Sequence, residues 1–106
     1  MGQISDLAVR AAENAVAHGW WDEERETGTL IALMHSELSE ALEYDRHGNP
    51  PSDHIPEFSG IEEELADVII RILDLAGSRR YRIEEAVLAK MAFNESRPYK
   101  HGGKKF

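Results

Sequence analysis

Apolar residues recur at helical spacing in two segments of this chain, and each segment also carries a pair of carboxylates. An α-helix turns by about 100° per residue, so residues three and four apart share one face. This spacing favours helices over strands, and we expect the two apolar faces to pack against each other. Segment 29–44 offers Leu30, Met34, Leu38 and Ala41, and segment 61–76 offers Ile61, Leu65, Val68, Ile72 and Leu75.

The carboxylate pairs lie at the borders of these apolar stripes. Glu37 and Glu40 belong to the first segment, and Glu64 and Asp67 to the second. A buried carboxylate without a partner loses hydration worth several kcal/mol. Acidic residues make up 20 of the 106, so one pair at this spacing also arises by chance. Two pairs on packed helices predict a site for a hard cation with oxygen ligands.

Length and charge narrow the class of protein. A chain of 106 residues is expected to form one domain, 1–106, whose modest core would gain from association into a homo-oligomer. The absence of cysteine fits a reducing compartment, and the lack of a long apolar run or signal-like start predicts a soluble, cytoplasmic protein without membrane contact. The net charge of -8 argues against nucleic acid polymers as partners. Free nucleotides carried with a divalent cation remain possible ligands.

The sequence predicts four helices and no sheet. The first runs from about Ser5, a plausible N-cap, to His18, and Gly19 stops it. The second spans about 27–46, and a loop with three prolines follows between positions 48 and 60. The third is capped by Ser59 and ends around Gly77, and the fourth runs over about 82–96.

The fourth helix carries a basic stripe. Ile83 and Val87 define its inward face, and Lys90, Asn94 and Arg97 continue that direction. A basic tail over about 97–106 follows, and it includes Lys100, His101, Lys104 and Lys105. These cations are suited to holding a polyphosphate opposite a metal. The alternative is that Lys90 extends into solvent and that the tail is frayed.

Three stretches of the chain together resemble one known family. IALMHSELSEALEYDR, IEEELADVIIRILD and KMAFNESRPYKHGGKK are similar to the MazG-like all-α nucleoside triphosphate pyrophosphohydrolases, in particular the small single-domain type of bacteria, phages and mobile elements. The resemblance spans roughly positions 17–105. It implies an all-α, four-helix bundle completed by oligomerisation, as a dimer or tetramer. The family's paired acids and ExxD motif correspond to Glu37, Glu40, Glu64 and Asp67.

The resemblance also suggests nucleotide contacts. The family's downstream lysine and asparagine match Lys90 and Asn94, and its aromatic base contact matches Trp21, with Trp20 as the alternative. Some relatives place a tyrosine four residues after the ExxD aspartate, where this chain has Arg71. That arginine is placed to pair with Asp67 or Asp74 or to reach a phosphate, and the sequence leaves these open.

The first helix offers further candidates for reading the base. Asn14 carries both a donor and an acceptor, and His18 lies one turn further on. An exposed helical asparagine is the equally plausible alternative.

The implied activity is hydrolysis of a nucleoside triphosphate to the monophosphate and pyrophosphate, with Mg²⁺, or Mn²⁺ in its place, held by the four carboxylates. Glu37 or Glu40 would orient or deprotonate the attacking water, and Lys90, Arg97, Arg71 and the tail lysines Lys100 and Lys104 would contact phosphate. Deoxynucleotides are favoured, with dGTP or dCTP ahead of others, in adjustment or cleansing of the nucleotide pool.

Other classes fit less well. The chain lacks the Glu-x-x-His pairs of di-iron bundles, a His-Asp dipeptide and a Gly-rich phosphate loop. The rival hypothesis is a helical nucleotide-binding or dimerisation module without catalytic activity.

Overall fold

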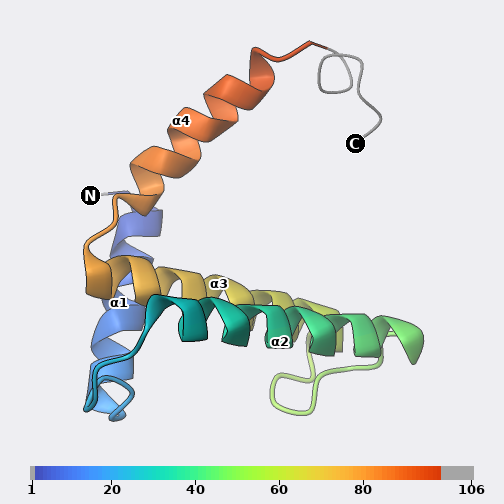
Figure 1. The fold of residues 1–106 in the computed structure, drawn as a ribbon. Coiled ribbons are helices and arrows are strands. Elements are labelled where there is room, and N and C mark those ends of the chain that lie inside the picture. Colours follow the sequence, from blue (N-terminus) through green and yellow to red (C-terminus); the bar gives the residue numbers. More distant parts are fainter. Residues whose placement is uncertain (1, 99–106) are drawn as a thin grey trace.

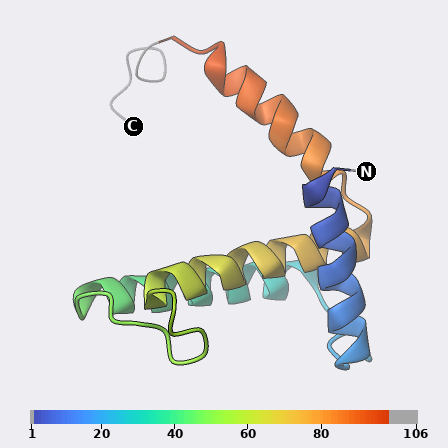
Figure 2. The ribbon, with the colours of Figure 1, turned by 180° about the vertical axis from the view of Figure 1, so that it is seen from behind.

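The computed structural model describes residues 2–98. They form four helices, α1 (Gln3–Ala17), α2 (Thr27–Arg46), α3 (Gly60–Arg79) and α4 (Ile83–Glu95), and no strand occurs in this part of the chain. The predicted all-α class is therefore confirmed. The helices α2 and α3 lie side by side along their length, α1 crosses one end of this pair, and α4 projects away from it (Figures 1 and 2).

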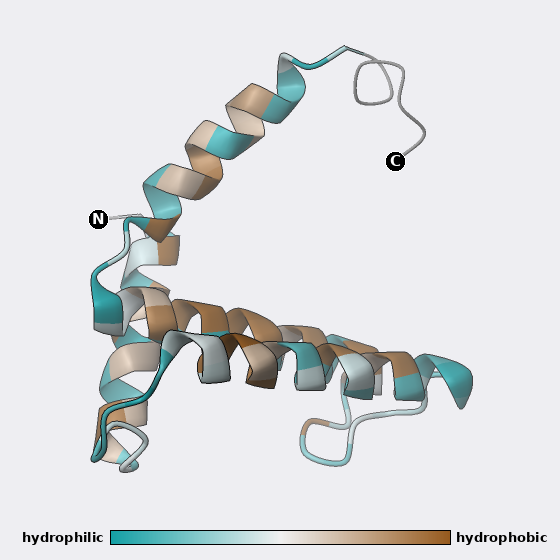
Figure 3. Cartoon of the chain, in the orientation of Figure 1, coloured by the Kyte–Doolittle hydropathy of each residue, from teal (hydrophilic) through white to brown (hydrophobic). Residues whose placement is uncertain are grey.

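Helices α2 and α3 are paired by small and aliphatic side chains. Leu30 and Ala41 are the buried residues of α2, and the buried apolar residues of α3 are Val68, Leu73, Leu75 and Ala76. The hydropathy colouring shows how much more apolar α3 is than its partner (Figure 3). The apolar stripes predicted for these helices are therefore correct only in part, because Leu38, Leu65 and Ile72 are exposed.

Helix α1 crosses α3 where both backbones come close. Ala8 and Ala15 are its buried residues, whereas Leu7 and Val16 are exposed. A Cβ atom on Gly77 of α3 would lie 2.6 Å from the carbonyl oxygen of Ala8, so only glycine fits this crossing. The helix continues past this crossing to Arg79, close to the end predicted around Gly77.

The ends of the helices agree with the predictions at some points and differ at others. Ser59 caps α3 in a capping box with Glu62, as predicted. Ser5 is not the cap of α1, which begins after Gly2, and its backbone N–H donates instead to Oε1 of Glu84 in α4. Arg80, with a φ of 60°, ends α3 in the left-handed conformation.

The loop between α2 and α3 is held by a buried serine. Ser52 is 2% exposed, and its hydroxyl accepts the backbone N–H groups of His54 and Ile55 and donates to the carboxylate of Glu63. An antiparallel bridge joins Pro51 to Ser59. The predicted loop with three prolines is therefore an ordered segment that connects α2 and α3.

Helix α4 has no buried residue. Its Leu88, Met91 and Phe93 are all exposed, and apolar residues of α1, α2 and α3 are exposed as well. The four predicted helices are present, but they do not close a bundle within one chain, because α4 packs only at its start, against α1. Completion of the bundle by oligomerisation stays a prediction. None of the described helices is long and apolar enough to cross a membrane.

The crossing of α1 and α3 provides a stability test. Gly77→Ala would place a methyl group against the α1 backbone, and we expect it to lower the free energy of unfolding by about 1–3 kcal/mol in urea denaturation. Gly28→Ala is the matched control, because a Cβ atom there meets nothing within 4 Å, and it should be neutral or stabilising by up to about 1 kcal/mol. Equal stability of the two variants would contradict the proposed close contact.

Candidate metal and nucleotide site

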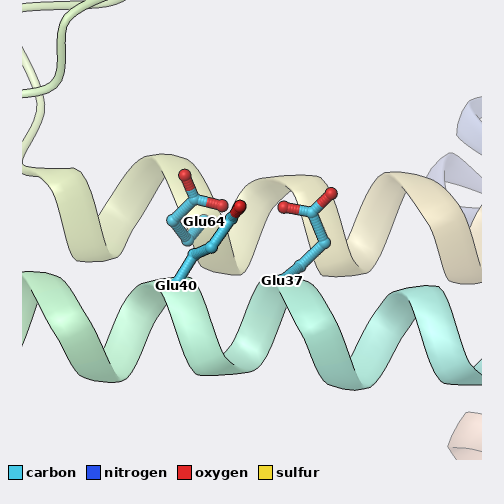
Figure 4. A group of neighbouring side chains, drawn as sticks. All are labelled: Glu37, Glu40 and Glu64. Carbon is cyan, nitrogen blue, oxygen red and sulfur yellow. The ribbon is translucent and has the colours of Figure 1, made fainter.

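Carboxylates from α2 and α3 meet between the two helices. Oxygen atoms of Glu37, Glu40 and Glu64 lie within 4.8 Å of one another (Figure 4). Oxygen atoms of Glu63, Glu64 and Asp67 form a second group within the same distance. The structure thus brings together the acids predicted from helical spacing, with Glu64 shared by both groups. Glu63 was not predicted, although its position four residues before Asp67 places it on the same face of the helix.

Glu64 is the most deeply buried of these acids. The residue is only 8% exposed, and its Oε2 has no hydrogen-bond partner among the described residues. Burial, together with the neighbouring carboxylates of Glu37 and Glu40, raises the pKa of Glu64 to about 8. Burial and the charges of nearby glutamates also raise the pKa of Asp67. A proton or a cation is needed to satisfy this oxygen, so the residues fit a metal site.

Glu37 differs from Glu64 because it has a cationic partner. The Nε and Nη2 atoms of Arg71 lie 2.9 and 2.8 Å from its Oε1. Burial raises the pKa of Glu37, but hydrogen bonds from Glu64 and Arg71 outweigh this and lower it below 4.5. The arginine thus pairs with neither Asp67 nor Asp74, the partners that the sequence suggested.

Glu63 is held on the loop side of the cluster. It accepts the Ser52 hydroxyl and lies 2.8 Å from Nδ1 of His54. These two contacts lower the pKa of Glu63. The contact between Glu63 and His54 also raises the pKa of His54. Glu63 is therefore a structural anion that fixes the loop beside the other acids.

A cavity of about 210 Å³ opens next to the carboxylates, toward α1. It joins Glu37, Asp67 and Arg71 to two residues predicted to contact the base, Asn14 and Trp20. Arg25 and Asp74 also line it, and sequence reasoning did not assign either to the site. The guanidinium of Arg25 lies 5.3 Å from the centre of the Trp20 ring, in cation–π contact. Nothing in the local sequence marks Arg25, because a loop residue finds its neighbours only in the fold.

Neither Trp21 nor His18 lines this cavity. The Trp21 indole N–H donates to Oδ1 of Asp74 at 2.9 Å, and the guanidinium of Arg79 stands 5.3 Å from its ring centre. Its ring lines a separate groove with residues of α1 and the end of α3. His18 contacts the Asn14 carbonyl oxygen at the end of α1. Of the two tryptophans, Trp20 is thus the one beside the carboxylates.

The basic stripe of α4 does not reach the carboxylates within one chain. Lys90, Asn94 and Arg97 are exposed, and Lys90 Nζ lies 4.5 Å from the centre of the Phe93 ring. The prediction that this stripe faces the packed side is wrong, because α4 leaves the body of the molecule after its first turn (Figure 1). Its phosphate contacts stay a prediction, and Lys100 and Lys104 lie outside the described residues.

The buried carboxylate predicts an unusual pH dependence of stability. Because the pKa of Glu64 is higher in the folded chain than its ordinary 4.5, the folded state binds the proton more tightly. Its stabilising effect is complete below about pH 4.5 and is lost as the pH rises toward about 8. In chelator, the melting temperature of Glu64→Gln should therefore exceed that of the unmodified chain by an amount that grows across this range.

Glu13→Gln is the matched control, since Glu13 is exposed on α1 and its substitution should produce no such growing difference. A constant difference between Glu64→Gln and the unmodified chain at all pH values would contradict the raised pKa.

Comparison with known proteins gives two relatives of one kind. The chain is 33% identical over 98 residues to dCTP pyrophosphatase 1 of Homo sapiens and 30% identical over 98 residues to that of Bos taurus. The matches cover 89% of this chain and 58% of each relative, so the chain spans somewhat more than half their length. No family model and no solved structure matches it. The chain is thus similar to dCTP pyrophosphatase 1 over most of its own length, and its helices are consistent with the all-α fold expected from its sequence.

Proposed function

We propose that this chain hydrolyses nucleoside triphosphates between the α- and β-phosphates and releases the monophosphate and pyrophosphate. The observation that carries this proposal is the convergence of acids from α2 and α3 on the buried Glu64, whose Oε2 has no hydrogen-bond partner among the described residues. Similarity to proteins named dCTP pyrophosphatase 1 supports the same activity.

A divalent cation, Mg²⁺ or Mn²⁺, would neutralise phosphate charge and lower the pKa of a bound water. The residues suited to hold it are Glu37, Glu40, Glu64 and Asp67, whose oxygen atoms are the ligands that such hard cations prefer. Glu40 is the exposed member, and it can orient or deprotonate the attacking water together with Glu37. The metal identity and these roles are part of the proposal.

The base would occupy the cavity of about 210 Å³ beside the carboxylates. Trp20 is 53% exposed there and offers a ring face for stacking, and the side-chain amide of Asn14 can pair with a base edge. The name of the two relatives favours dCTP as substrate over the alternative, dGTP. Asn94 and Trp21, which the resemblance also suggested, do not line this cavity.

A second copy of the chain would complete the structure. The exposed apolar residues of α1, α3 and α4 include Leu7, Ile69, Ile70, Leu88 and Met91, more than a soluble monomer usually leaves uncovered. Lys90 and Arg97 would then contact phosphates only in a partner's site, because α4 points away from the carboxylates of its own chain.

The metal-site variants test the activity. Glu64→Gln and Asp67→Asn keep the shape of the site and remove one charge each, so we expect the dCTP hydrolysis rate to fall by at least about 100-fold with Mg²⁺ while helix content is unchanged. Chromatography should show dCMP and pyrophosphate as products of the unmodified chain. Binding of dCTP without any product would instead support the nucleotide-binding module.

The two tryptophans can be separated by experiment. Trp20→Ala should raise the KM for the preferred nucleotide by about 5- to 100-fold, which is the loss of one base–aromatic stack, with little change in melting temperature. Trp21→Ala should instead lower the melting temperature, because it removes the hydrogen bond to Asp74 and the contact with Arg79. An unchanged KM in Trp20→Ala would overturn the placement of the base.

A further inference from the structure

Arg71 has an unusual position for a residue beside a cation site. It lies on α3, one turn after Asp67, and both of its contacting nitrogens converge on the single oxygen Oε1 of Glu37 across the helix pair. The side chain of Glu37 is 12% exposed and that of Arg71 30% exposed, so the pair is partly shielded from water. A guanidinium stays charged at all physiological pH values. One of the four proposed ligands is therefore already neutralised by a cation of the chain itself.

This contact has a cost for metal binding. A divalent cation beside Glu37 would lie within a few ångströms of the Arg71 charge, and like charges repel strongly at such distances in a partly buried site. The cation can therefore bind the Glu37 carboxylate more tightly when the Arg71 guanidinium moves away from it.

The structure also shows where the guanidinium can go. Arg71 lines the cavity that holds Asn14, Trp20 and Arg25, and its partner Glu37 lines the same cavity. A nucleotide with its base in this cavity and its phosphates at the acids would lie beside Arg71. Guanidinium groups bind phosphate oxygens as well as they bind carboxylates.

From these contacts we propose that Arg71 exchanges partners during binding. Without ligand it neutralises Glu37, and when nucleotide and cation enter together it moves to a phosphate oxygen and frees Glu37 for the cation. This inference rests on the proposed function for the identity of the ligand. It makes cation and nucleotide binding mutually dependent: the cation alone binds weakly, and the triphosphate removes the competing charge.

The test uses Mn²⁺ and α,β-methylene dCTP, which cannot be cleaved between its α- and β-phosphates, in titration calorimetry. For Arg71→Gln we expect Mn²⁺ alone to bind about tenfold more tightly than in the unmodified chain, because the competing charge is gone. The analogue, with Mn²⁺ present, should bind about tenfold more weakly, because its phosphate partner is lost. The two changes have opposite signs, which a merely structural role of Arg71 would not produce.

Arg46→Gln is the matched control. Arg46 forms an exposed ion pair with Glu43, 3.2 Å away on α2, so this variant changes the net charge equally without touching Glu37. Both affinities should stay within about twofold of the unmodified chain.

Arg71→Lys keeps the charge and should preserve the weak binding of Mn²⁺ alone. If Arg71→Gln fails to fold, Arg71→Tyr, with the residue that some relatives carry, should show the same opposite changes.

Unchanged or weaker binding of Mn²⁺ alone in a folded Arg71→Gln variant would overturn the exchange. This failure is distinct from failure of the proposed function, which is judged by hydrolysis of dCTP in the unmodified chain. A chain that cleaves dCTP but whose Arg71→Gln variant does not gain Mn²⁺ affinity would refute the exchange alone. Opposite shifts in a chain that cleaves nothing would support the exchange at a nucleotide-binding site without catalysis.

Discussion

The burial of the Glu64 carboxylate between α2 and α3 is the constraint on which the rest of the structure depends. A charge in this position is unfavourable in an ordinary core, and its Oε2 finds no partner among the described residues. The neighbouring acids have partners of their own, which limit the repulsion between charges: Arg71 neutralises Glu37, and Ser52 and His54 bind Glu63. Small side chains are among the buried residues of both helices, Ala41 in α2 and Ala76 in α3, and the acids of the two helices meet between them.

Helical periodicity predicted most of the fold, because it follows from local chain geometry. The bounds of α2, the cap at Ser59 and the meeting of Glu37 with Glu64 are all consequences of spacing along one helix or two adjacent ones. Periodicity identifies an apolar face but not what covers it, which is why the position of α4 could not be predicted. The role of Gly77 could not be predicted for a related reason, since a glycine required by a neighbouring backbone looks in the sequence like a glycine that ends a helix.

The candidate site was predictable where its chemistry is local and unpredictable where it depends on the path of the chain. Paired carboxylates stand out in an apolar segment, so the acids were found. Trp20 and Trp21 are adjacent in sequence but line different cavities, and this difference becomes visible only in the folded chain. Arg25 lies in a loop without periodicity and becomes a neighbour of the acids only when α2 and α3 are paired.

The pKa values of two adjacent residues of α3, Glu63 and Glu64, are shifted in opposite directions. This difference links the binding of a cation to the release of a proton. Glu63, with its serine and histidine contacts, stays ionised, whereas Glu64 keeps its proton until the pH approaches about 8. Under the proposed function, a cation that binds Glu64 near neutral pH would release the proton of this carboxyl into solution. The heat of cation binding should then vary with the ionisation enthalpy of the buffer, and acidification alone should empty the site without unfolding the chain.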